Sequence, residues 1–196
     1  MSVASIVGPG QPVPGAEEAS EIDALTAGFA ASELAARLGR ASDVRREERF
    51  AFLLAGGVLM TGALDVLARE SPGRMLVVDY KSDRLQGAAP ETALSGSYAT
   101  QRLVYALAAI RAGAAEVEVA HVFLEAPGDP VVARFQAAEA ETMERELNEL
   151  TSGVAERRFE VTEIPQRSIC TGCPAEGGLC SWPLEMTRRE SVEQLF

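Results

Sequence analysis

Hydrophobic residues recur at helical spacing near the start of the chain. Between Glu21 and Gly39, large apolar side chains return every three to five residues, at Ile22, Leu25, Phe29, Leu34 and Leu38. This spacing predicts one helix with Ser20 as its N-cap and Gly39 as its C-cap. The preceding segment, Val7–Gly15, is rich in glycine and proline, so residues 1–19 are predicted to form a flexible arm or linker.

Three shorter apolar segments follow, and turn-forming residues separate them. The segments are Arg49–Ala55, Val58–Ala68 and Arg74–Lys81, divided by Gly56-Gly57 and by Glu70-Ser71-Pro72-Gly73. Such a pattern predicts consecutive antiparallel strands. The third segment contains the unbroken apolar run Met75–Val78, which is typical of a central strand buried on both faces.

The second half of the chain continues the alternation of helices and strands. The predicted elements are a helix over Tyr98–Ala112 between the cap Ser97 and the stop Gly113, strands over Val117–Glu125 and Val131–Gln136, and an amphipathic helix over Glu139–Leu150 with Met143, Leu147 and Leu150 on its apolar side. Together these elements predict an α/β domain over residues 20–165, with a mixed central sheet flanked by helices. Residues 166–196 are predicted to form an irregular, cysteine-containing tail packed on that core.

Composition and charge narrow the class of protein. The 196 residues suffice for one domain with its own core, and no apolar stretch reaches the ~20 residues that cross a membrane. The first residues lack a basic segment followed by an apolar signal core, so we expect a soluble, cytoplasmic protein without a membrane partner. A net charge of -11 disfavours an autonomous duplex-binding module, because such modules collect lysine and arginine against phosphates.

Three charged side chains are predicted to share one face of two neighbouring strands. Asp65 lies on the second predicted strand, and Asp79 lies on the third, two residues before Lys81, the only lysine of the chain. A hairpin of this length brings the two carboxylates side by side, and strand alternation puts Asp79 and Lys81 on the same face. Two such carboxylates repel unless a cation lies between them, and oxygen ligands of this kind suit Mg²⁺ or Mn²⁺. Lysine is a compact charge suited to orient or deprotonate an attacking water.

A simpler interpretation is open for the same residues. Asp79 and Lys81 can form a surface ion pair at a strand end while Asp65 closes a turn, because a D-x-K pattern is frequent by chance. The following predicted helix favours a site, since Gln101 and Tyr105 are four residues apart and therefore share one face. An amide and a phenol there can hold a phosphate, a water or the lysine, although an ordinary half-buried helical pair has the same spacing.

Four short patterns occur in a characteristic order along the chain. They are Glu47-x-x-Phe50, Gly62-x-x-Asp65, Asp79-Tyr80-Lys81 and Gln101-x-x-x-Tyr105. Together they resemble the RecB-like branch of the PD-(D/E)XK nucleases, over residues from about Ile22 to Arg189. Within that branch the chain resembles the C-terminal nuclease domains of AddA-type and UvrD-like helicase-nucleases. The resemblance implies a restriction-endonuclease-like fold.

The resemblance also implies a role for each matching residue. Asp65, Asp79 and the backbone carbonyl of Tyr80 would hold the divalent metal, and Lys81 would be the catalytic lysine. The pair Gln101 and Tyr105 would support the site and the substrate. The glutamate of the first pattern, Glu47, matches a family glutamate ahead of the first strand and would act behind the metal ligands.

One departure from the family concerns histidine. Family members that cut DNA usually carry a metal-binding histidine on a helix upstream of the first strand, whereas the single histidine here, His121, falls in a later predicted strand. We therefore expect His121 to be structural, and the upstream helix to be absent or replaced by the glycine- and proline-rich arm. The chain would then be a fragment of a longer helicase-nuclease or a shortened relative.

The three cysteines lie close together in the predicted tail. Cys170, Cys173 and Cys180 fall within eleven positions, so a disulfide framework is not expected. They resemble the end of the four-cysteine iron-sulfur set of some RecB-like nucleases, whose remaining cysteine lies far upstream. No upstream cysteine exists here, and Glu176 is a poor fourth ligand for a cluster or a closed zinc site. Three reduced thiols near Trp182 are the favoured interpretation, although a partner or a missing segment could complete a site.

The sequence therefore predicts a Mg²⁺- or Mn²⁺-dependent deoxyribonuclease of the exonuclease type. It would receive single-stranded DNA from a helicase motor during double-strand-break repair and recombination. The alternative is a catalytically weakened or inactive nuclease fold with a structural or docking role in a DNA-repair complex, which the missing upstream histidine and the acidic composition favour. A third and weaker alternative is an iron-sulfur or zinc domain centred on the tail.

Overall fold

The described residues belong to two compact units. The computed structural model describes residues 13–94, 97–158 and 161–190. They divide between Met1–Ser152 and Gly153–Phe196, and the first unit carries all five strands. Most of the arm predicted over residues 1–19 lies outside the described residues, although a helix already begins at Ala16. Packing of the tail on the core stays a prediction.

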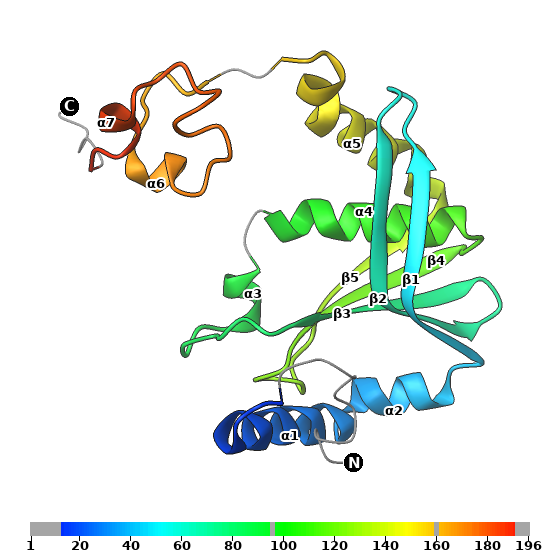
Figure 1. The fold of residues 1–196 in the computed structure, drawn as a ribbon. Coiled ribbons are helices and arrows are strands. Elements are labelled where there is room, and N and C mark those ends of the chain that lie inside the picture. The colour runs from blue at the N-terminus through cyan, green and yellow to red at the C-terminus, as the bar shows by residue number, and fades with distance from the viewer. Residues whose placement is uncertain (1–12, 95–96, 159–160, 191–196) are drawn as a thin grey trace. The chain divides into compact units, whose positions relative to one another are not determined.

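A five-stranded mixed sheet forms the centre of the first unit (Figure 1). Its strands, in the order β1-β2-β3-β4-β5 across the sheet, are β1 (Asp43–Leu53), β2 (Leu59–Ser71), β3 (Arg74–Lys81), β4 (Glu116–Phe123) and β5 (Val131–Gln136). The strands β3 and β4 pair in parallel, and the other neighbours pair antiparallel. This topology confirms the predicted α/β class and its three consecutive antiparallel strands.

Helices cover both faces of this sheet. The first face carries α1 (Ala16–Ala30) and α2 (Glu33–Arg40), and the second carries α4 (Ser97–Arg111) and α5 (Ala140–Ala155), with the short α3 (Pro90–Ala93) ahead of α4. Successive residues of β3 enter different cores: Met75 and Val77 pack under α4, and Leu76 and Val78 pack under α2. The apolar run is unbroken because β3 is a central strand, as the sequence predicts.

The N-terminal helical segment is two helices and not one. Ser32 interrupts it, because its hydroxyl caps α2 by accepting a hydrogen bond of 3.1 Å from the Ala35 backbone N–H. The predicted caps Ser20 and Gly39 therefore lie inside α1 and α2. The break turns Leu34 into the sheet, where it is buried, whereas α1 has no buried residue.

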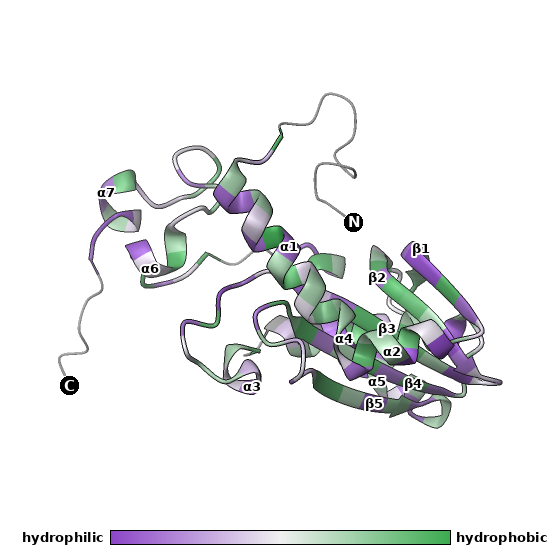
Figure 2. Ribbon diagram, turned by 90° about the horizontal axis from the view of Figure 1, so that it is seen from below, coloured by the Kyte–Doolittle hydropathy of each residue, from purple (hydrophilic) through white to green (hydrophobic). Residues whose placement is uncertain are grey.

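Several other boundaries differ from the predicted ones. The strand β1 begins at Asp43, six residues before the predicted start, because an edge strand with an exposed face accommodates charged residues (Figure 2). The helix α4 includes Ser97, one residue before the predicted start, and it stops before Gly113, whose φ is +100°. The helix α5 runs past Leu150, which is 57% exposed and not part of its apolar side.

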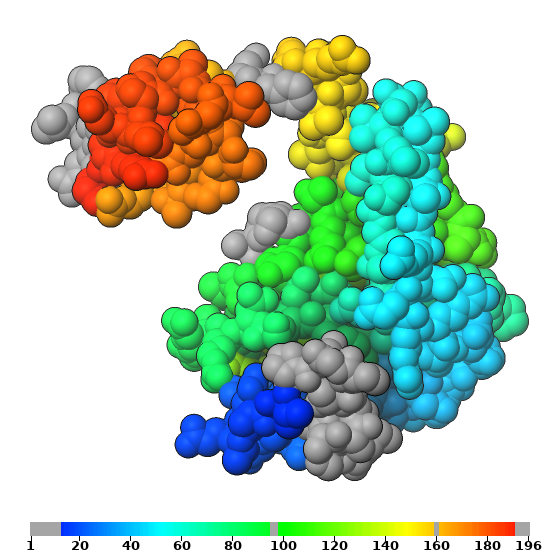
Figure 3. Space-filling view, in the orientation of Figure 1, coloured from blue at the N-terminus to red at the C-terminus, as the bar shows by residue number. Residues whose placement is uncertain are grey.

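The β1–β2 hairpin extends beyond the rest of the sheet, and its tip is fixed to α5 (Figure 3). The backbone N–H of Ala55 donates to Glu144 at 2.9 Å, and that of Gly56 donates to Asn148 at 2.8 Å. These bonds hold the long hairpin in place beside the second face of the sheet.

The second unit contains two short helices that the sequence did not predict. They are α6 (Arg167–Cys170) and α7 (Leu184–Thr187). Side-chain to backbone bonds tie the unit together, because the Trp182 indole donates to the Thr162 carbonyl at 2.8 Å and the Arg189 guanidinium donates to the Pro165 carbonyl at 2.7 Å. In neither unit is any described helix long and apolar enough to cross a membrane.

A buried ion network anchors α2 on the first face of the sheet. The Arg37 guanidinium donates two bonds to Glu70, at 3.0 and 3.1 Å, and one of 2.6 Å to Glu118, which is only 1% exposed and also accepts from Arg134 at 2.9 Å. Burial by itself raises the pKa of Glu118, but the hydrogen bonds and charges of Arg37 and Arg134 outweigh it and lower that pKa below its usual value.

Replacing Arg37 by alanine is expected to lower the free energy of unfolding by about 3 kcal/mol, because Glu118 keeps its buried charge but loses its shortest partner. When a carboxyl has a lower pKa in the folded protein than in the unfolded chain, its charge stabilises the fold at pH values above the unfolded-chain pKa. That stabilisation is lost as the pH falls through the pKa of the folded protein. The parent should therefore lose more stability than Arg37→Ala between pH 7 and acidic pH, as urea unfolding would measure. The control Arg40→Ala, on an exposed arginine of the same helix, should lower the free energy of unfolding by less than about 1 kcal/mol. Equal losses in the two variants would show that the ion network does not stabilise the fold.

Candidate active site

Two adjacent strands, β2 and β3, bring the predicted carboxylates together. Val66 of β2 pairs with Val78 of β3, and at the next position along both strands Asp65 comes beside Asp79. Asp65 is half-buried, and its Oδ2 accepts a hydrogen bond of 2.8 Å from the Tyr80 backbone N–H. The side-by-side arrangement expected of the two carboxylates is therefore present.

Asp79 and Lys81 form a buried pair and not a surface one. Their exposures are 3% and 9%, and Lys81 Nζ lies 2.7 Å from Asp79 Oδ2. Both side chains point to the face covered by α4, as strand alternation predicts. The simpler interpretation, an exposed ion pair at a strand end, is therefore wrong.

Gln101 of α4 connects these residues. Its amide nitrogen donates to Asp79 Oδ1 at 3.2 Å and to the Tyr105 hydroxyl at 2.8 Å, and its carbonyl oxygen accepts from Lys81 Nζ at 3.0 Å. The reverse amide orientation would set the NH₂ group against the ammonium, so the electrostatics select this one. Gln101 and Tyr105 share the face of α4 that the sequence predicts, and that face meets the carboxylate and the lysine.

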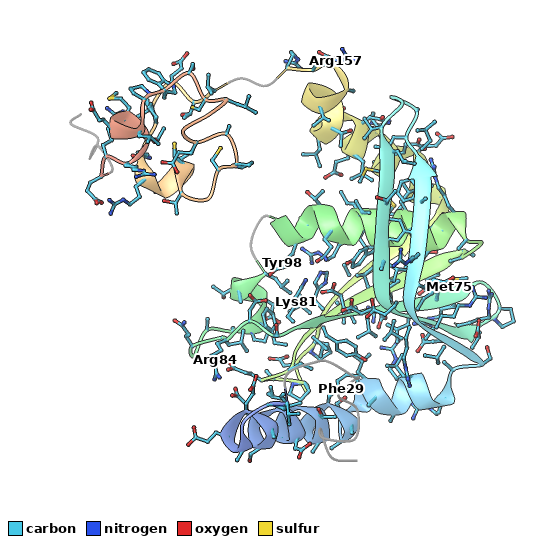
Figure 4. The ribbon with its side chains drawn as sticks, in the orientation of Figure 1. Phe29, Met75, Lys81, Arg84, Tyr98 and Arg157 are labelled. Carbon is cyan, nitrogen blue, oxygen red and sulfur yellow. The ribbon has the colours of Figure 1, made fainter. Side chains whose placement is uncertain are left out.

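The aromatic residues of α4 shape the surroundings of the lysine. Lys81 Nζ lies 4.3 Å from the centroid of the Tyr98 ring, a cation–π contact, and Figure 4 shows the two side chains near the start of α4. Burial and, next, the charge of Asp79 raise the pKa of Tyr105 to about 12. The Tyr105 hydroxyl therefore stays protonated throughout the neutral range.

His121, which the sequence predicts to be structural, also belongs to this cluster. It lies directly opposite Asp79 in the parallel β3–β4 pair, is fully buried, and places Nε2 3.2 Å from Gln101 Oε1. Burial and, next, the positive charge of Lys81 lower the pKa of His121 to about 4, so the ring is neutral at neutral pH. Tyr98 packs edge-on against it, with ring centroids 5.8 Å apart.

Phe50 links two of the sequence patterns. It pairs with Gly62 across β1 and β2, and its ring packs edge-on against Tyr105, with centroids 6.2 Å apart. A Cβ atom at position 62 would lie 2.6 Å from Cζ of the Phe50 ring. The glycine of the Gly62-x-x-Asp65 pattern is therefore needed to seat the phenylalanine that supports Tyr105.

Gly62→Ala is expected to destabilise the fold by about 1–3 kcal/mol, because the Phe50 ring must leave its position to avoid the new methyl group. The control Gly39→Ala lies in α2, where a Cβ meets nothing within 4 Å, and should stabilise by up to ~1 kcal/mol through helix propensity. Chemical denaturation of both variants measures the two signs. A Gly62→Ala protein as stable as the parent would show that the ring moves without cost.

Glu47 lies within β1 and not ahead of the first strand, which corrects the expected placement. It falls between the pairs Arg46↔Val66 and Glu48↔Leu64, has a φ of +51°, and is exposed. A glutamate in this left-handed conformation is strained, and such residues gather at functional sites. Its position opposite Asp65 brings it to the edge of the cluster, and a role behind the metal ligands stays a prediction.

The carboxylates of the cluster fit a hard divalent cation. Asp79 Oδ2 is buried without a hydrogen-bond partner, although the Lys81 charge lies close, and Asp65 is the neighbouring carboxylate. Within the ranges that the structure describes, no three His, Cys, Asp or Glu side chains form a metal-binding group. A two-carboxylate site still suits Mg²⁺, which usually keeps waters and takes substrate oxygens as further ligands. The Tyr80 carbonyl as an additional ligand stays a prediction.

The three cysteines of the second unit have different environments. Cys170 is buried, Cys173 is exposed and Cys180 is half-buried, with its sulfur 3.5 Å from the Trp182 backbone nitrogen. No metal-binding group of three such side chains is found around them in the described part of the chain. Glu176 is engaged instead by Thr187 and Arg188, both at its Oε1.

A helical segment precedes β1, as the hydrophobic spacing between Glu21 and Gly39 predicts. It consists of α1 and α2, which carry no histidine. Phe29 of α1 packs edge-on against Tyr80 with ring centroids 5.0 Å apart, and Glu21 pairs with Arg84, which follows β3. The segment therefore lies against the strand that carries the cluster, on its opposite face.

Comparison with known proteins gives a family match and several similar solved structures. The family model described as the PD-(D/E)XK nuclease superfamily matches residues 11–178. No protein with a curated description matches the chain. Among solved structures, the chain is similar to that described as "Crystal structure of SSO0001", at 14% identity and a TM-score of 0.43 over 79% of this chain. The similar region spans 65% of that protein, just under two thirds.

Proposed function

Because the chain belongs to the PD-(D/E)XK nuclease superfamily, we propose that it is a divalent-metal-dependent nuclease that hydrolyses phosphodiester bonds of DNA at the cluster around Asp79. One observation carries the proposal: a buried carboxylate, the single lysine and the Gln101 amide are joined by contacts of 2.7 to 3.2 Å. Stability alone does not favour such a site, because burying a lysine together with a carboxylate costs free energy that well-packed apolar side chains would avoid.

Each residue of the cluster has its own role in the proposed reaction. Asp65, Asp79 and the Tyr80 carbonyl would hold Mg²⁺ or Mn²⁺. Held there, the metal would supply Lewis-acid chemistry to a water and to the phosphate. Lys81 Nζ orients the attacking water and stabilises the charge that develops on the phosphate oxygens. Gln101 holds Nζ through its carbonyl oxygen, and Tyr105 holds the amide.

The surroundings of the cluster favour a phosphate. Tyr98 and Gln101 belong to the first turns of α4, so the positive end of this helix lies near Lys81. The chain as a whole carries a net charge of -11. An acidic domain of this kind fits a strand delivered by another component, so we propose single-stranded DNA as substrate and a helicase motor as partner, in double-strand-break repair and recombination.

The function is tested with end-labelled linear single-stranded DNA, linear duplex and circular single-stranded DNA, each with Mg²⁺ or Mn²⁺. We expect cleavage of the linear single strand and none of the circle, because an exonuclease needs an end. Lys81→Ala is the control for contaminating nucleases. Cutting of the circle would overturn the exonuclease type, and equal cutting by parent and Lys81→Ala would overturn the assignment of activity to this chain.

A second candidate is a nuclease fold with weakened catalysis that serves a structural or docking role in a repair complex. The observation that favours it is the absence of histidine from α1 and α2, the helices ahead of β1. This candidate predicts that the folded parent binds single-stranded DNA or a helicase but cuts no substrate with either metal. Metal-dependent cutting by the parent excludes it.

A further inference from the structure

His121 occupies a position that packing alone does not explain. The ring is fully buried, yet Nδ1 has no hydrogen-bond partner among the described residues. A buried polar atom without a partner destabilises a fold, and an apolar side chain of similar size would avoid that loss. The polar contact on the other side of the ring joins Nε2 to the Gln101 side chain.

That contact has a fixed direction. The Gln101 carbonyl oxygen can only accept, so the 3.2 Å contact makes His121 Nε2–H the donor, whether the ring is neutral or charged. Lys81 Nζ donates to the same oxygen at 3.0 Å. Two donors therefore converge on one side of the amide, while Asp79 Oδ1 and the Tyr105 hydroxyl oxygen accept on the other side.

We propose that His121 is a positioning residue that locks the Gln101 amide and, through it, the place of Lys81 Nζ beside Asp79. If the amide turned over, its NH₂ group would meet both donors and its oxygen would face the carboxylate. The backbone supports this arrangement, because the β3–β4 pairing sets His121 directly opposite Asp79. Tyr98 closes the remaining side, since its ring contacts both the imidazole and the ammonium.

The test compares three substitutions that differ in where they place a donor. A glutamine amide reaches the position of imidazole Nε2, an asparagine amide reaches only that of Nδ1, and leucine has no donor. His121→Leu and His121→Asn should lower the turnover number for DNA cleavage by about 10–100-fold with little change in KM, as loss of a supporting hydrogen bond typically does. His121→Gln should keep most of the rate.

A second readout does not depend on activity. Since Lys81 is the only lysine, protein grown on ¹³Cε-lysine gives one lysine resonance. That resonance should shift in His121→Leu and His121→Asn and stay near the parent position in His121→Gln. His121→Leu should unfold at or above the parent temperature, because it removes the unpartnered Nδ1, whereas a packing role predicts a lower one.

The outcomes test the positioning role of His121 and the proposed nuclease function separately. If His121→Leu keeps the parent resonance and rate, or if Asn and Gln behave alike, His121 does not position the lysine. If His121→Leu fails to fold, the Gln and Asn pair decides in the same way. The rate comparison rests on the proposed nuclease function, but a parent that cuts no DNA would overturn that function alone, because the resonance still reports the position of Lys81.

Discussion

Asp79→Asn is expected to lower the single-turnover rate of DNA cleavage by at least ~10²–10³-fold. Asparagine keeps the shape of the side chain and an oxygen for the Gln101 amide. It removes the negative charge that lies 2.7 Å from Lys81 Nζ and that is proposed to bind the metal. The loss should persist at metal concentrations that saturate the parent. The rate is measured with enzyme in excess over end-labelled single-stranded DNA.

The matched control for this prediction is Asp129→Asn. Asp129 is exposed in the turn between β4 and β5, so the same chemical change there should leave the cleavage rate within about twofold of the parent, as for surface substitutions in general. Thermal unfolding of both variants shows whether the fold is intact. An Asp79→Asn protein that cleaves as fast as Asp129→Asn would remove this carboxylate from the reaction.

Lys81→Met is expected to lower the same rate by ~10²–10⁴-fold, the range for loss of a group that transfers or orients a proton. Methionine fills a similar volume without the charge, so the space between Asp79 and the Tyr98 ring stays occupied. Lys81→Arg restores the charge but should recover less than about a tenth of the rate, because a planar guanidinium does not fit where the ammonium contacts both Gln101 and the ring. Single-turnover kinetics at fixed Mg²⁺ compares the three proteins.

Full recovery of the rate by arginine would show that any positive charge at this position suffices. That result would contradict the specific use of lysine, while leaving a metal-dependent reaction at Asp79 in place. A parent-like rate in Lys81→Met would contradict any role of the lysine in the reaction.

The parts of the site that the sequence predicts are those fixed by local geometry. The tight turn after β2 and the register shift between Arg69 and Ser71 together set the pairing of β2 and β3, so Asp65 and Asp79 come side by side. Strand alternation carries Lys81 to the same face as Asp79. In the same way, the four-residue spacing of Gln101 and Tyr105 on a helix needs no tertiary information.

The parts that the sequence does not predict depend on contacts between distant segments. His121 reaches Asp79 only because β4 returns parallel to β3 after α4, with a register that no local pattern sets. Tyr98 belongs to the cluster because the first turn of α4 lies against Lys81. The only sequence feature that indicates this is the position of Tyr98 three residues before Gln101, which places both side chains on one face of the helix. The five-residue gap between Phe29 and Leu34 was likewise the signal for the break between α1 and α2.

The positive φ of Glu47 has no sequence signal either. Glutamate rarely adopts a positive φ, so nothing in the Arg-Arg-Glu-Glu-Arg segment marks the gap in the β1–β2 pairing opposite Asp65. The buried pair of Arg37 and Glu118 also has no sequence signal. In the sequence both residues have the pattern of ordinary surface charges, and only the packing of α2 on the sheet buries them.

The most direct measurement of the central claim is cleavage of linear single-stranded DNA by the purified parent and by Lys81→Met, first with Mg²⁺, then after chelation, and then with Mg²⁺ restored. We predict that the parent cleaves, stops on chelation and resumes when the metal returns, while Lys81→Met stays inactive throughout. Cleavage that survives chelation, or that is equal in the two proteins, would contradict a metal-dependent nuclease site at Asp65, Asp79 and Lys81.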